Sequence, residues 1–83
     1  MKSLRGEQHK TFVAELKRIR SEAGFTQAAL AEKLGVPQSF VAKVEGLERR
    51  LDVVEFVNWM EALNQSSEIS IICDRVLTAH HRQ

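Results

Sequence analysis

The chain has 83 residues, 43% of them apolar, and a formal net charge of +1, which supports one small domain with a single core and by itself singles out no class of partner. Its lone cysteine, Cys73, excludes an internal disulfide and a Cys-rich zinc site, so a reducing, cytoplasmic setting is expected. No apolar run approaches the ~20 residues that span a bilayer, and the polar start MKSLRGEQHK lacks the apolar stretch of a signal peptide.

The first part of the chain predicts an arm followed by a helix. Residues 1–8 show no apolar pattern, so we expect a flexible N-terminal arm there. A helix is predicted over residues 9–23, because apolar residues recur on one helical face: Phe12, Leu16, Ile19 and Ala23. Gly24 is suited to end this helix, since it has no Cβ.

Two short helices with a tight turn between them are predicted over residues 27–34 and 37–45. Thr26 suits the N-cap of the first helix, and Gly35 suits the left-handed residue that closes it. Pro37 has no N–H to lose at the start of the second helix. The apolar positions of the pair recur at helical spacing: Leu30, Ala31, Leu34, Val41 and Val44. A small residue, a glycine and an apolar residue at these offsets indicate a helix-turn-helix.

The last part of the chain predicts two more helices. The helix over residues 52–63 begins at an Asp52 cap, and its inward stripe is expected to be Val53, Phe56, Val57, Met60 and Leu63, with Trp59 also in the core. The helix over residues 67–80 should turn one apolar face inward, with Ile71 apart from it: Ile69, Ile72, Cys73, Val76 and Leu77. We therefore interpret residues 66–83 as partly core and partly a self-association surface.

Four stretches, LKRIRSEAGFTQ, LAEKLGV, PQSFVAKVEG and RRLDVVEFVNWMEAL, give the chain a family resemblance over roughly residues 12–63. It resembles the phage Cro/repressor-like helix-turn-helix regulators, also called the xenobiotic-response-element type. The resemblance implies a compact, all-α, lambda repressor-like domain of five helices, with residues 9–65 as the DNA-binding domain. It also implies a bacterial or phage regulator of transcription, commonly a repressor, that binds double-stranded DNA as a homodimer.

The helix over residues 37–45 is the expected recognition helix. With its valines inward, its exposed side holds Gln38, Ser39, Ala42 and Lys43. The Gln38 amide can pair with adenine, and Lys43 can reach guanine or a phosphate. Phe40, near the edge, could contact a thymine methyl or fill a packing gap. Three further residues match family positions that contact phosphate: Gln27, Arg49 and Arg50.

The resemblance also implies a buried ion pair between Arg20 and Glu45. The chain departs from the family pattern just after Glu45. The family usually has its glycine two residues after this glutamate, whereas here Gly46 comes immediately and Leu47 occupies the usual glycine position. Because a left-handed leucine is strained, we expect the helix to close at Gly46 instead. The path of the loop over residues 47–50 is left open.

Charge and missing motifs bear on function. Up to Arg50 there are ten Lys/Arg against six Asp/Glu, and after it two against five, so the basic half contains the recognition helix. Two alternatives remain: the DNA-binding antitoxin of a toxin–antitoxin pair, and a protein-binding module that has lost DNA affinity. No nucleophile–base arrangement, Gly-rich phosphate loop or metal-ligand spacing is present, so we expect no enzyme, metal or cofactor, and assign no role to His80 and His81.

Overall fold

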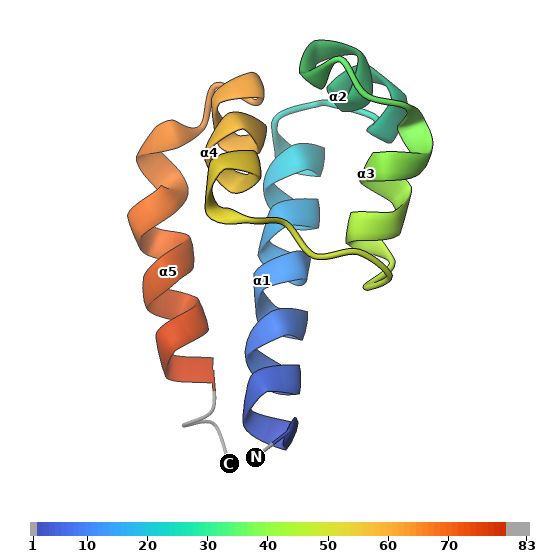
Figure 1. Cartoon of the computed structure of the whole chain (residues 1–83). Helices are drawn as coiled ribbons and strands as arrows, with labels where there is room; N and C mark the ends of the chain where they lie inside the picture. The colour runs from blue at the N-terminus through green and yellow to red at the C-terminus, as the bar shows by residue number, and fades with distance from the viewer. Residues whose placement is uncertain (1, 80–83) are drawn as a thin grey trace.

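The computed structural model describes the backbone of residues 2–79, with side chains from Gly6 onward. It contains five α-helices and one short 3₁₀ turn, and no strand between residues 2 and 79 (Figure 1). Their bounds are α1 Lys2–Glu22, α2 Gln27–Leu34, α3 Gln38–Glu45, α4 Val53–Ala62, η1 Ser66–Glu68 and α5 Ile69–Thr78. The predicted all-α, five-helix class is therefore confirmed. None of the described helices has the length and apolarity that a membrane crossing needs.

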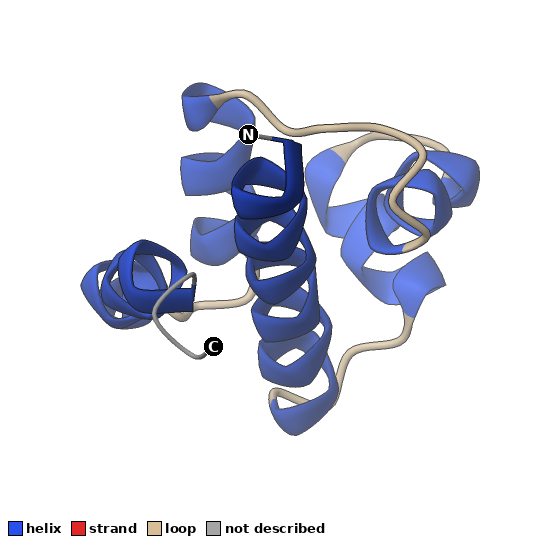
Figure 2. Cartoon of the chain, turned by 90° about the horizontal axis from the view of Figure 1, so that it is seen from below, coloured by secondary structure: helices blue, strands red, loops and turns tan. Residues whose placement is uncertain are grey.

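The long helix α1 lies between two groups of helices. The α2–α3 pair lies on one side of α1 and α5 lies on the other, in both views (Figures 1 and 2). Helix α1 contacts α3 and α5, and α2 contacts α3 and α4. In this arrangement α1 and α2 pack against the short helix α3 and hold it in place.

One hydrophobic core joins these helices. Its ten buried residues come from α1, α2, α3, α4, the residue that follows α4, and α5: Leu16, Ile19, Leu30, Ala31, Val41, Val44, Trp59, Met60, Leu63 and Ile72. Trp59 is fully buried, as predicted. A side chain of this size removes ~150–250 Å² of surface from water, which contributes several kcal/mol to the free energy of unfolding. The small Ala31 is also buried, where α2 packs closely on its neighbours.

The start of α1 differs from the sequence-based expectation. Helix α1 begins at Lys2 and not at residue 9, so residues 2–8, predicted as an arm, are helical, and Met1 lies outside the described residues. Within this segment the Gln8 side-chain amide donates to the Val76 carbonyl at 3.3 Å, a long-range contact between α1 and α5. Such a contact leaves no apolar period in the sequence.

The buried faces of α4 and α5 are also partly different from the expected ones. In α4, Val53 and Val57 are exposed at 75% and 43%, because Trp59 takes the core position beside Met60 and turns the stripe away from them. In α5, Leu77 is 64% exposed and Cys73 is exposed, while Ile72 is buried. The helix proper begins at Ile69 after the 3₁₀ turn, and residue 80 of the expected helix lies outside the described residues.

Candidate nucleic-acid interface

The turn between α2 and α3 has the local geometry that the sequence predicts. Thr26 caps α2, its hydroxyl accepting from the Ala29 N–H at 3.0 Å. Gly35 closes α2 with φ +73°, a conformation that costs glycine little. Pro37 then stands in extended conformation directly before α3. The chain therefore passes from one short helix to the next within three residues.

Helix α3 has a buried face and an exposed face. Val41 and Val44 are buried against the core at 0% and 1% exposure. Three of the predicted base-contacting side chains are exposed: Gln38, Ser39 and Lys43. The other two, Phe40 and Ala42, are half-buried. The polar groups of α3 are thus accessible from outside while its apolar side fixes it to the domain.

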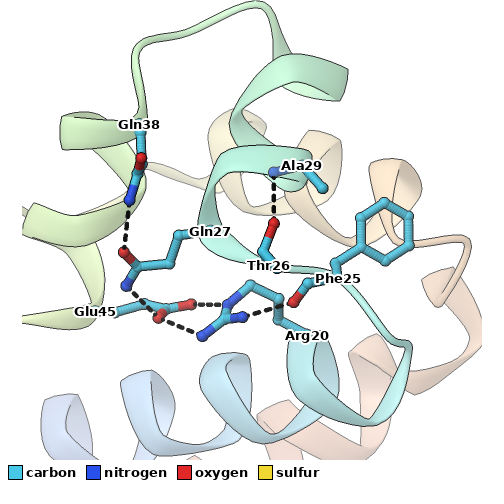
Figure 3. A network of polar contacts seen from close by, with 7 residues as sticks. All are labelled: Arg20, Phe25, Thr26, Gln27, Ala29, Gln38 and Glu45. Atoms are coloured by element: carbon cyan, nitrogen blue, oxygen red, sulfur yellow. Dashed lines mark hydrogen bonds and ion pairs between the residues drawn. The ribbon is translucent and has the colours of Figure 1, made fainter.

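A polar network ties α3 to α1 (Figure 3). Arg20 forms a two-point ion pair with Glu45, Nε to Oε2 at 2.7 Å and Nη2 to Oε1 at 3.0 Å, and its Nη1 donates to the Phe25 carbonyl at 2.6 Å. This is the pair that the resemblance implies, and the Glu45 side chain in it is only 2% exposed. A paired, hydrogen-bonded buried charge is held in one geometry, which fixes the end of α3.

The network continues to the start of α3 through Gln27. The Gln27 amide donates to Glu45 Oε1 at 2.9 Å, and its oxygen lies 3.5 Å from the Gln38 amide nitrogen, a long and weak contact. Gln27 is half-buried and therefore partly engaged within the domain, whereas Gln38 is exposed. The Gln38 side chain, at the first residue of α3, is therefore held only weakly within the domain and can exchange this contact for another partner.

The two loop arginines differ in their surroundings. Arg49 donates to both carboxylate oxygens of Glu55 at 3.0 Å and to the Arg50 carbonyl at 2.8 Å, and its guanidinium lies 4.4 Å from the ring centre of Phe40. Arg49 and Phe40 are therefore engaged with each other and with α4. Arg50 is exposed.

Sequence reasoning missed Glu55 as the partner of Arg49. Asp52 and Glu55 form a capping box at the start of α4, a spacing that is visible in the sequence. The hydrogen bonds from Arg49, and then the one from the Asp52 N–H, lower the pKa of Glu55 below its usual value. Glu55 thus accepts hydrogen bonds both from the loop, through Arg49, and from the N-cap of its own helix, through the Asp52 N–H.

The end of α3 corrects one expectation. Helix α3 ends at Glu45, but Leu47 adopts the left-handed conformation with φ +67°, so the prediction that it would avoid this region is wrong. The reason is the closing hydrogen bonds: the Leu47 N–H reaches the Val44 carbonyl at 3.2 Å and the Glu48 N–H reaches the Lys43 carbonyl at 2.8 Å. A left-handed residue is needed at this point to bring those donors back to the helix.

A short helix pair of this shape, with a supported second helix that exposes polar side chains, is the arrangement of helix-turn-helix DNA-binding proteins. Residues 11–66 match the family described as "Helix-turn-helix domain", and the chain belongs to this family. The described residues contain no group of three or more His, Cys, Asp or Glu side chains that could hold a metal ion.

The fold is also similar to that of a solved structure, the XRE-family like protein from Pseudomonas syringae pv. tomato str. DC3000. The two share 35% sequence identity with a TM-score of 0.83, over 93% of this chain and 92% of that one. None of the curated proteins matches the chain. The family and this match make the chain a DNA-binding regulator of the Cro-like, xenobiotic-response-element type.

Proposed function

We propose that this protein binds duplex DNA sequence-selectively as a homodimer and represses transcription by occupying its operator. The observation that carries the proposal is the exposed polar face of α3, which holds Gln38, Ser39 and Lys43 on a helix whose other face is buried. A helix of this kind fits the major groove, where donor and acceptor patterns distinguish the base pairs.

Each exposed residue has a role in this proposal. Gln38 pairs with adenine, Ser39 contacts an adjacent base, and Lys43 contacts guanine or a phosphate. Ala42 borders this set as a half-buried methyl group. The Gln27 and Arg50 side chains hold the phosphate backbone on either side and set the register.

The homodimer follows from the size of the surface. A single small module buries little DNA surface, and two copies place their recognition helices about 34 Å apart in successive major grooves. The domain has apolar residues exposed on α4 and α5 that a second copy could cover: Val53, Val54, Val57, Ile71 and Leu77. We propose that the self-contact uses these helices.

Selection of bound fragments from a random duplex pool tests the proposal. We expect enrichment of one pseudo-palindromic sequence. The solution mass of the complex should correspond to two protein chains on one selected duplex. Unenriched fragments would contradict selective binding, and a bound mass of one chain would contradict the homodimer. Co-purification of a small unrelated protein seated on α5 would favour the antitoxin alternative.

A further inference from the structure

A pocket of about 240 Å³ opens between the first half of α1, the loop of residues 46–52 and α5. It is lined by Gln8, His9, Phe12, Arg50 and Val76. The loop that supplies Arg50 leads from α3 to α4 and passes across α1 (Figure 1). The pocket therefore adjoins the segment that follows the recognition helix.

The walls of the pocket are fixed by contacts within the domain. The Gln8 amide is hydrogen-bonded to the Val76 carbonyl on α5, and the Phe12 ring packs edge-on against Phe56 with centres 5.1 Å apart. Among the described residues, neither His9 nor Arg50 has a side-chain hydrogen bond or ion pair. The imidazole of His9 and the guanidinium of Arg50 thus line the pocket together with the apolar Phe12 and Val76.

None of the described side chains that line the pocket is acidic. Of the described groups that line it, α1 contributes the His9 imidazole, the loop contributes the Arg50 guanidinium, and α5 contributes only the apolar Val76. Burial, and then the charge of Arg50, lower the pKa of His9 below its usual value. An anion between the two groups would remove this repulsion and favour the protonated imidazole.

We infer that this pocket binds one phosphate group of the DNA backbone, held between Arg50 and His9. The inference rests on the proposed function and adds to it a contact from His9 of α1, a residue that lies before the first residue of the family match at residue 11. It also couples DNA binding to protonation of His9, so the complex tightens as the pH falls.

The test uses the full chain and a random-sequence duplex, because a backbone contact needs no operator. The ring signals of His9 are followed by NMR from pH 8 to pH 5, free, with the duplex, and with inorganic phosphate at the same phosphate concentration. We expect the duplex to raise the pKa of His9. For each unit by which the pKa rises, binding below the free and bound pKa values of His9 should be roughly tenfold tighter than binding above them.

Affinity measurements on variants provide the second readout. His9→Gln should lose most of the gain in affinity between pH 8 and pH 6, whereas Lys10→Gln, at an exposed neighbouring position outside the pocket, should keep it. The other histidines, His80 and His81, are unchanged in both variants, so their titration cancels in the comparison.

Three outcomes would overturn the inference. Binding of the duplex with an unchanged pKa of His9 would overturn it alone and leave the proposed function standing. A rise in the pKa with inorganic phosphate but not with duplex would show a site for free phosphate instead of DNA. Absence of any duplex binding by the unmodified protein would overturn this inference and the proposed function together.

Discussion

Leu47 carries local strain that a single substitution can remove. Its φ of +67° is costly for a residue with a Cβ, and the residue is 46% exposed, so little packing is lost when its side chain is removed. We expect Leu47→Gly to stabilise the fold by about 1 kcal/mol. Chemical denaturation followed by the fluorescence of Trp59, the one tryptophan, measures this.

The adjacent residue supplies the control for this prediction. Glu48 is also exposed but has no positive φ, so Glu48→Gly should destabilise the fold through the flexibility that glycine adds to the unfolded chain. If both variants shift the midpoint in the same direction, strain at Leu47 is not the cause.

The ion pair between Arg20 and Glu45 gives a second prediction at this scale. Because Glu45 is buried at 6% exposure, Glu45→Gln leaves the Arg20 charge without its partner and should cost about 3–5 kcal/mol of unfolding free energy. The matched control is Glu22→Gln, which breaks the surface pair Arg18–Glu22, two-thirds exposed on the Glu22 side. That change should cost less than about 1 kcal/mol, and equal losses would rule out a buried pair.

Residues whose neighbours are close in sequence were predictable, and residues with distant partners were not. Thr26 as a cap and Gly35 in the turn follow from contacts within about four residues, and the inward valines of α3 follow from the helical spacing of apolar residues. The engagement of Arg49 with Phe40 and Glu55 depends on how the loop folds back, which no local spacing reveals. The left-handed Leu47 was missed because closing hydrogen bonds outweighed the steric preference of one residue.

At the scale of helices, periodicity located all five elements but misplaced some of their faces. In α4 the predicted inward stripe held Val53 and Val57 beside Phe56 and Met60, and packing against the other helices, including the contact of Phe12 with Phe56, leaves the two valines exposed. The first turns of α1 were invisible because a polar contact to Val76 helps to dock them. These are tertiary choices between patterns that are locally equivalent.

Glu15 links α1 to α5 and predicts a pH dependence of stability. Its Oε1 accepts from Arg18 at 2.7 Å and from Arg75 at 2.9 Å. Burial acts to raise the pKa of Glu15, but the hydrogen bonds and charges of these arginines outweigh it and lower the pKa below 4.5. A lowered pKa means that the native state binds fewer protons than the unfolded state, so this stabilisation is present above the unfolded value.

Acid titration of stability tests the role of Glu15. The stabilisation should disappear as the pH falls below about 4.5 and through the lower native pKa. Glu15→Gln should be less stable at pH 7 and should lose less stability in this acid range, whereas Glu32→Gln at an exposed position of α2 should follow the unmodified protein. Parallel acid curves for the unmodified protein and Glu15→Gln would show that Glu15 does not contribute.

The loop of residues 46–52 contains two adjacent arginines whose substitution should have different effects. Arg49→Gln should lower thermal stability, because it removes the clamp to Glu55 and the stacking on Phe40. Arg50→Gln should leave the melting temperature unchanged and lower the slope of log affinity against log salt by about one. A stability loss for Arg50→Gln, or an unchanged melting temperature for Arg49→Gln, would reverse these assignments.

At the scale of the whole molecule, charge and apolar surface occupy different elements. The surplus of basic residues lies in the part of the chain up to Arg50, which includes α3, and the acidic surplus follows it. Among the side chains that the structure describes, the large exposed apolar ones lie on α4 and α5, with Leu47 in the loop. Such a division suits a protein that meets DNA with one side and a second copy with another.

The central claim is that the exposed face of α3 reads base edges, and comparison of two duplexes tests it most directly. Gln38→Ala removes an exposed amide that no core contact needs, so folding should be unaffected. On the duplex selected by the unmodified protein, we expect this variant to lose about 1–3 kcal/mol of binding free energy, with binding to random duplex nearly unchanged. Equal losses on both duplexes would contradict the claim.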